Sequence, residues 1–236
     1  MEIKPQPVWR WLAVLLVGVL VWSIAKAVGT LVILGVVGSP EKVTGLWLVP
    51  WGMIFIPLAT AGIAWTLRIA DRGLRDLGLT ARNAWRDALI GAAVAVLWVA
   101  LDFFVLIPLT GGSGRSDVIA SRAAIGDAPW GLVGGIISGW IVGGFGEELF
   151  FRGFLIHTLR NLFGNKPWAA GIAVLISVLY FAFGHAYQGW IGVVDVGVSG
   201  LIFSLLYLWR GRLTSSMAAH GVFDMLGILG IYFLYR

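Results

Sequence analysis

Long apolar runs separated by short polar segments fill the chain from Trp11 onward. A membrane-spanning helix needs about 20 mainly apolar residues, and seven runs reach about this length. They cover residues 11–37, 46–69, 88–109, 130–163, 167–187, 190–209 and 213–235. The pattern predicts an all-α, polytopic transmembrane helix bundle of about seven to eight helices. Nothing separates a soluble unit, so residues 1–236 are expected to form one domain.

Composition supports the bilayer as the solvent of this chain. Hydrophobic residues make up 59% of the sequence, charged residues only 12%, and the mean hydropathy is +0.90. A soluble domain is closer to half apolar and a quarter charged. In hydrocarbon the backbone must satisfy its own hydrogen bonds, so long apolar runs favour helices. The first run exceeds the length of a signal-peptide core and is expected to remain as the first membrane helix.

Two further counts exclude other classes of protein. The chain has no cysteine, which rules out disulfides, thiolate zinc sites and a cysteine nucleophile. The net charge of +5 is compatible with nucleic-acid binding, but the arginines fall in short loops between apolar runs. Basic residues in such loops set membrane topology. We therefore expect the lipid bilayer, and no nucleic acid, as a partner.

The distribution of basic residues predicts the orientation. With the N-terminus inside, the inner segments hold 11 Lys and Arg residues, namely Lys4, Arg10, Arg68, Arg72, Arg75, Arg82, Arg86, Arg160, Lys166, Arg210 and Arg212. The outer segments hold four, namely Lys42, Arg115, Arg122 and Arg236. The positive-inside rule then predicts a multi-pass protein of the cell membrane with a cytoplasmic N-terminus.

Two loops have a distinct composition. Residues 68–87 combine apolar residues with five arginines, so they form either an amphipathic helix on the inner leaflet or a solvated loop. The glycine-rich stretch 111–114 begins an outer loop in which the sequence indicates no chemistry.

Several ionisable residues lie inside the predicted helices, where each charged group costs about 2.5–3.5 kcal/mol on insertion scales. They are Lys26, Asp102, Glu147, Glu148, Arg152, Asp195, Asp224 and the only three histidines, His157, His185 and His220. Asp102 and Asp195 match no motif and are interpreted as packing or cavity-lining groups, with Lys26 able to pair with either. His157 lies near a helix end, where an interfacial position is expected.

Spacing on a helix predicts which of these side chains meet. Glu148 and Arg152 are four residues apart and can form an ion pair on one face. Glu147 points about 100° away from Glu148, which leaves it without that counter-ion and free to act as a general base. His220 and Asp224 are again four apart and share a face.

Taken in order, these motifs resemble a known family. Glu-Glu-x-x-x-Arg, Phe-x-x-x-His and His-x-x-x-Asn/Asp, each on its own hydrophobic helix between 143 and 224, are similar to the CAAX protease and bacteriocin-processing family, also called CPBP or ABI. Leu77-Gly78-Leu79 adds to the likeness. The resemblance implies an intramembrane glutamic protease whose catalytic half is 130–235. It implies that Glu147 and His185 activate water, that His220 and Asp224 stabilise the oxyanion, and that Glu148 and Arg152 brace Glu147.

One residue departs from the family pattern, because many members carry Asn at the position of Asp224. An ionised Asp cannot donate a hydrogen bond to an oxyanion. Asp224 is therefore protonated, or it orients His220 as an acceptor, or the activity is low.

The expected function is an intramembrane endopeptidase that hydrolyses peptide bonds of membrane-associated substrates. Two alternatives stay open, a non-catalytic scaffold or bacteriocin-immunity-type protein and a proton-coupled transporter. No cofactor is expected, although a divalent metal such as zinc remains possible, with Glu147, His185 and His220 as ligands. The expected partner is a peptide or protein substrate in the membrane, and neither its prenylation nor the oligomeric state follows from the sequence.

Helix length predicts where the site lies. At 1.5 Å per residue the run 130–163 would be about 51 Å long, against about 30 Å of hydrocarbon. We therefore expect this helix and the next to protrude on the inner side, with a cavity more accessible from that side.

Overall fold

A computed structural model describes residues 6–235, in which we find helices and no strand. Lys4 and Arg236, which entered the charge asymmetry above, lie outside the described residues. The longer elements are α1 (Val8–Val37), α2 (Leu48–Leu67), α3 (Ala84–Leu101), η5 (Asp102–Leu106), α4 (Ile107–Leu109), α5 (Ser116–Ile125), α6 (Pro129–Ser138), η7 (Gly139–Ile156), α7 (His157–Leu162), α8 (Ala169–Phe183), α9 (Gly189–Arg210) and α10 (Leu213–Leu234). Short 3₁₀ turns, η1 (Pro40–Lys42), η2 (Gly45–Trp47), η3 (Arg68–Ala70), η4 (Leu74–Leu77), η6 (Gly112–Gly114) and η8 (Ala186–Gln188), lie in the connections.

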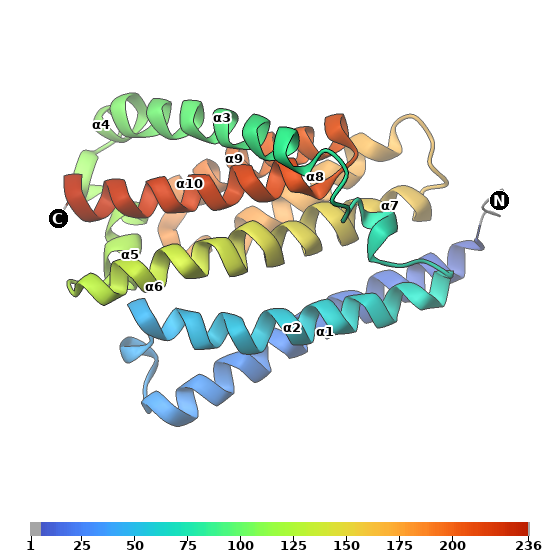
Figure 1. Cartoon of the computed structure of the whole chain (residues 1–236), viewed down its shortest axis with the longest axis horizontal. Helices are drawn as coiled ribbons and strands as arrows, with labels where there is room; N and C mark the ends of the chain where they lie inside the picture. The colour runs from blue at the N-terminus through green and yellow to red at the C-terminus, as the bar shows by residue number, and fades with distance from the viewer. Residues whose placement is uncertain (1–5, 236) are drawn as a thin grey trace.

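Seven long helical segments run alternately between two ends of a bundle (Figure 1). Three of them are composite or short, because α3 continues through η5 into α4, α6 continues through η7 into α7, and α8 is only 15 residues long. The short helix α5 is the eighth. The predicted all-α bundle of seven to eight helices is thus confirmed. We call the end that holds the start of α1 the N-terminal end and the opposite one the C-terminal end.

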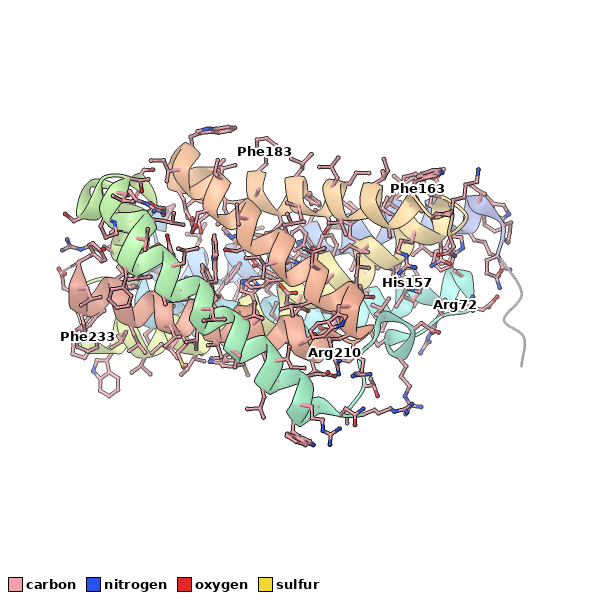
Figure 2. All side chains as sticks on the ribbon, turned by 90° about the horizontal axis from the view of Figure 1, so that it is seen from above. Arg72, His157, Phe163, Phe183, Arg210 and Phe233 are labelled. Carbon is pink, nitrogen blue, oxygen red and sulfur yellow. The ribbon has the colours of Figure 1, made fainter. Side chains whose placement is uncertain are left out.

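The helices have the length and surface of membrane spans. Five of them, at residues 8–37, 45–70, 84–109, 186–210 and 213–234, are long and apolar enough to cross a bilayer by length and composition. The run 129–162, bent by 108° from α5, can form a sixth span with it. Large apolar side chains such as Leu31 and Leu97 are exposed, and Phe183 projects outward from α8 (Figure 2). This is the architecture of a multi-pass membrane protein, and its orientation remains a prediction.

Aromatic packing places η7 at the centre of the bundle. Phe150 stacks on Trp22 of α1 with 4.3 Å between ring centroids, and Trp22 meets Phe55 of α2 edge to face at 4.6 Å. Phe154 points at Gly18 of α1, where a Cβ would overlap its ring. Since η7 also packs against α8 and α10, it is surrounded on all sides and holds the residues that it carries in fixed positions.

The segment 68–87 does not form an amphipathic helix. It consists of the turns η3 and η4 followed by the start of α3, which begins at Ala84 and so earlier than the predicted 88. Asp87 in the first turn of α3 is fully buried and forms ion pairs with Arg210 and Arg212. Leu77 of η4 is also buried, and the backbone of Gly78 accepts a hydrogen bond from Leu213 at 3.1 Å. Tertiary contacts therefore fix this loop to the bundle.

The outer loop that begins at 111–114 carries an ion-pair cluster that the sequence did not indicate. Arg115 is 3% exposed and binds Asp117 through Nε and Nη2, at 3.0 and 2.5 Å, and Asp102 through Nη1 at 3.4 Å. Burial acts to lower the pKa of Arg115, but its hydrogen bond to Asp117 and the negative charges of Asp117, Asp102 and Asp195 together outweigh burial and raise the pKa. Asp102 thus pairs with Arg115, and Lys26 pairs with neither Asp102 nor Asp195.

Candidate active site

The π-helical segment η7 carries both glutamates of the first motif. Glu148 and Arg152 are fully buried, and Arg152 Nη1 lies 2.9 Å from Glu148 Oε1, which confirms the predicted ion pair. Arg152 also donates from Nη2 to the carbonyl of Gly200 at 3.0 Å and lies 4.4 Å from the centre of the Phe181 ring. A Cβ at Gly200 would lie 3.0 Å from Nη2, so α9 must have glycine there to accept the guanidinium.

His220 of α10 connects the two glutamates. Its Nδ1 donates to Glu148 Oε1 at 2.8 Å, and its Nε2 lies 3.8 Å from Glu147 Oε2 and 3.6 Å from Asp224 Oδ2. The ring stacks on Phe203, with 5.0 Å between centroids. Because an ionised carboxylate only accepts hydrogen bonds, Nδ1 carries a proton. Nε2 can therefore donate only when the ring is an imidazolium.

The adjacent glutamates differ in exposure. The Glu148 side chain is 0% exposed, whereas those of Glu147 and Asp224 are 19% and 26% exposed. Gly143, one turn before Glu147, makes room for the second motif, since a Cβ there would overlap the Asp224 carboxylate and lie 3.0 Å from His220 Nε2. Glu147 and Asp224 are thus the carboxylates of the site that remain accessible.

His185 lies just after the C-terminus of α8. Its Nδ1 donates to the carbonyl of Phe181 at 2.9 Å, so in the neutral ring Nε2 is the acceptor. Phe181 therefore has two functions: its carbonyl fixes the tautomer of His185 and its ring covers Arg152. This explains the spacing of four in the Phe-x-x-x-His motif.

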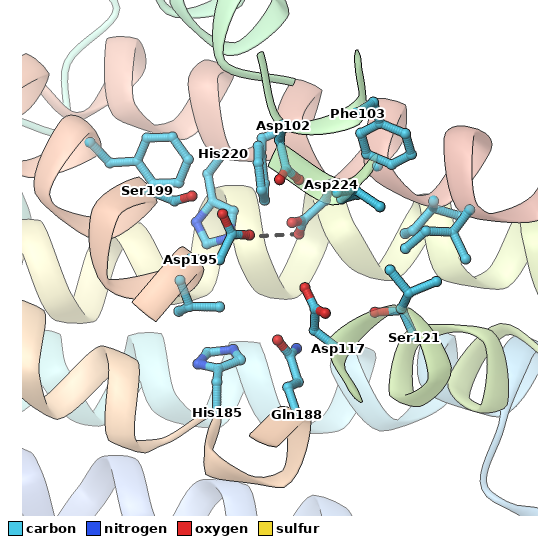
Figure 3. A pocket seen from close by; sticks show the side chains of 18 of the residues that line it. Asp102, Phe103, Asp117, Ser121, His185, Gln188, Asp195, Ser199, His220 and Asp224 are labelled. Carbon is cyan, nitrogen blue, oxygen red and sulfur yellow. Dashed lines mark ion pairs between the residues drawn. The ribbon is translucent and has the colours of Figure 1, made fainter. Parts of the chain in front are cut away.

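The side chains predicted to carry the chemistry share one cavity. Glu147, His185, His220 and Asp224 all line a space of about 360 Å³. A neighbouring cavity of about 150 Å³ is also lined by His185, His220 and Asp224. Figure 3 shows His185 and Gln188 of the α8–α9 connection facing Asp224 and His220 of α10 across this space. Residues from three distant parts of the chain thus meet as the sequence predicted.

The position of the cavity corrects one expectation. Its lining includes Ser121 and Ile125 of α5 and Tyr187 of η8, which belong to the C-terminal end of the bundle. That end is the outer one in the predicted orientation, so the cavity lies nearer the side opposite to the expected one, and the orientation itself stays a prediction. The expectation assumed a uniform α-helical rise and a full-length fifth helix, but η7 is π-helical and α8 ends at Phe183.

The remaining ionisable residues separate into two groups. Asp102 and Asp195 line the smaller cavity, in agreement with their interpretation as cavity-lining groups, together with Asp117, which the sequence did not single out. His157 meets Trp11 edge to face at 5.6 Å and lines neither cavity. Figure 2 places it toward the N-terminal end, near Arg72. Asp117 was missed because it lies on α5, whose position over the cavity no local pattern encodes.

The sequence leaves open that Glu147, His185 and His220 bind a divalent metal. Within residues 6–235 no group of three or more His, Asp or Glu side chains is arranged to hold a metal ion. His220 directs one of its nitrogens to Glu148 and His185 directs one to a backbone carbonyl, which leaves one nitrogen on each ring for other contacts.

Comparison with known proteins identifies the family. Residues 129–226, from the start of α6 into α10, match the family model described as type II CAAX prenyl endopeptidase Rce1-like. This match supports membership of the CPBP family for the segment from α6 into α10. No curated protein and no solved structure matches it. The matched segment contains all the CPBP motif residues, from Glu147 to Asp224, whereas α1, α2 and α3 lie outside it.

Proposed function

We propose that this CPBP protein is an endopeptidase that hydrolyses peptide bonds of membrane-associated substrates at the cavity between η7, α8 and α10. One observation carries the proposal: a partly exposed carboxylate, Glu147, lines the same cavity as His185 and His220. The family match is to CAAX prenyl endopeptidases, which supports a protease that acts on substrates at the membrane.

Glu147 is the general base in this proposal. Glu147 removes a proton from water, while Nε2 of neutral His185 accepts the second O–H of the same water. The hydroxide oxygen forms a bond to the peptide carbonyl carbon. The C–N bond then breaks, and Glu147 passes its proton to the leaving amine. The hydrogen bond from His185 to Phe181 supports this role, because it leaves Nε2 as an acceptor.

His220 stabilises the oxyanion in this proposal. As an imidazolium it donates through Nε2, the nitrogen that faces Glu147 and Asp224. Asp224 lies 3.6 Å from Nε2 and stabilises the imidazolium by its charge, so the single Nε2 proton stays available for the oxyanion, and Asp224 does not itself donate. This removes the need for Asn at this position. The i, i+4 spacing of the two residues on α10 supports the assignment.

Glu148 and Arg152 support the reacting groups without contacting the substrate. Glu148 holds His220 through Nδ1, and Arg152 neutralises Glu148 in the interior. Arg152 also ties η7 to α9 through Gly200. Loss of either charge would misplace His220, so we assign both as positioning residues.

The scaffold and transporter alternatives differ from this proposal in one measurable property, which is turnover. A carrier usually has two related halves, and the family match covers a single stretch that contains all three motifs.

For the topology we propose a cytoplasmic N-terminus, which places the cavity nearer the non-cytoplasmic side.

The proposal is tested by peptide release from purified protein in detergent, with Glu147→Gln as the variant. We expect turnover to fall by about 1,000-fold or more while the thermal unfolding midpoint stays at the wild-type value. The matched control is Glu41→Gln, because Glu41 is exposed in η1 and distant in sequence from the motifs. Retained turnover in Glu147→Gln contradicts the assignment.

We also propose a metal-free reaction. Exhaustive chelation should therefore leave the activity intact, and a loss of activity that Zn²⁺ restores would contradict this proposal.

A further inference from the structure

Lys26 is an intramembrane lysine for which the described part of the chain offers no partner. It lies on α1 about 17 Å from the Val37 end at 1.5 Å per residue, and its side chain is exposed. Neither a hydrogen bond nor an ion pair joins it to another described side chain, and Asp102 is occupied by Arg115. An uncompensated charge at this depth is costly and points to a ligand.

Lys26 lies where two hollows join. It lines the cavity of about 360 Å³ that contains Glu147. It also lines a groove of about 470 Å³ between α1, η7 and α8. Trp22, Phe151 and Gly184 line both spaces as well. A chain in the groove would therefore pass Lys26 on its way to Glu147.

The surroundings of Lys26 form a polar strip on an otherwise apolar helix. Ser23 and Thr30 lie three and four residues away and line the same groove. Trp51 of α2 donates to the Thr30 hydroxyl at 3.2 Å. This strip gives a peptide polar contacts at a depth where lipid offers none.

The charges that line the two spaces determine where a carboxylate of the substrate binds. The accessible titratable groups around the reacting centre are Glu147, Asp224, His185 and Tyr187, and the carboxylates among them lie on either side of His220. Their negative charge repels a substrate carboxylate there. Lys26 is the one Lys or Arg that lines either space within residues 6–235. A carboxylate therefore binds most favourably at Lys26.

We propose that Lys26 is a specificity-determining residue that binds a carboxylate of the peptide substrate and so sets which bond lies over Glu147. The inference rests on the proposed endopeptidase function and adds a substrate class to it. The carboxylate is either the C-terminus of the peptide or an acidic side chain near it, and both present the same charge to the ammonium group.

Three dye-labelled peptides distinguish these sources. Each has a prenylated Cys followed by two aliphatic residues and a last residue. The first ends in Ser as a free acid, the second in Ser as an amide, and the third in Glu as an amide. They are compared on wild type, Lys26→Met and Lys26→Arg, with Lys42→Met as the control, because Lys42 is exposed in η1 and lines neither space.

In the wild type we expect the free acid to have a KM about 10-fold lower than the Ser amide. Lys26→Met should abolish this difference with a smaller effect on kcat, whereas Lys26→Arg and Lys42→Met should preserve it. A low KM for the Glu amide identifies a side-chain carboxylate as sufficient, and a high one identifies the C-terminus. An equal loss for all peptides in Lys26→Met, or no loss for any, overturns the proposal.

The same comparison in the Glu147→Gln background separates the two proposals. There the dissociation constants of the peptides are measured without turnover. If Glu147→Gln still cleaves, the catalytic assignment fails, but the preference for a carboxylate still tests Lys26. If Glu147→Gln is inactive and Lys26→Met leaves the dissociation constants unchanged, only the inference on Lys26 fails.

Discussion

Two clusters of buried charge in this protein share their burial and differ in how their carboxylates are paired. At the N-terminal end, Asp87 is fully buried and each of its oxygens lies within 2.7 Å of an arginine nitrogen. Hydrogen bonding to Asp87 raises the pKa of Arg212, so this cluster stays charged. Around η7, Glu148 is also buried, but it is paired through Oε1 alone, with Arg152 at 2.9 Å and His220 at 2.8 Å, and its neighbour Glu147 keeps 19% exposure toward a cavity.

The comparison teaches that burial and pairing of charge do not by themselves indicate chemistry. A carboxylate whose oxygens are all held by arginines has no capacity left for a proton or a substrate. Among the described residues Glu147 forms one ion-pair contact, with His220 at 3.8 Å, and it faces space that a substrate can enter. Breaking each cluster should therefore have different consequences.

The largest effect is expected for Arg152→Met. It leaves Glu148 buried without its counter-ion, which costs about 3–5 kcal/mol of stability, and turnover should be lost because Glu148 no longer holds His220 in place. The measurements are the thermal unfolding midpoint in detergent and kcat. Adding Glu148→Gln removes the unpaired charge, so stability should partly return while turnover does not. A wild-type midpoint in Arg152→Met would show that the pair contributes nothing to the fold.

A smaller effect, confined to activity, is expected for Gly143→Ala. The added methyl group would overlap the Asp224 carboxylate and press on His220, so kcat should fall by about 10–100-fold. The control is Gly171→Ala on α8, where a Cβ meets nothing within 4 Å. Equal activity of the two variants would mean that the arrangement of Asp224 and His220 is not needed for turnover.

Local spacing explains which parts of the site the sequence could predict. The pairing of Glu148 with Arg152 follows from their spacing of four residues on one helix, whereas the meeting of Glu147, His185 and His220 was implied by the resemblance to the CPBP family. The hydrogen bond from His220 to Glu148 could not be predicted, because it depends on how α10 packs against η7. The roles of Glu147 and Asp224 remain predictions.

The fold shows the same division. Apolar runs predicted all seven long helical segments, with ends that shift by a few residues. They did not predict α5, because its sequence is too polar and too short to stand out. They also did not predict the buried Arg115, which pairs with Asp117 of α5 and with Asp102 of η5 and so joins the two elements. The end of the bundle at which the cavity lies depends on α5 and on the short α8, which is why helix length alone gave a different expectation.

The smallest effect on activity is expected for Asp87→Asn, which tests the other side of the comparison. The substitution keeps the shape of the side chain but removes the charge that binds Arg210 and Arg212, so stability should fall by about 1.5–3 kcal/mol. Since the cluster lines neither cavity, kcat of the folded protein should stay within about 2-fold of wild type. The unfolding midpoint and kcat are measured on one preparation. A stable variant with greatly reduced kcat would mean that the N-terminal end acts on the chemistry, and exposure toward a cavity would then no longer distinguish the two clusters.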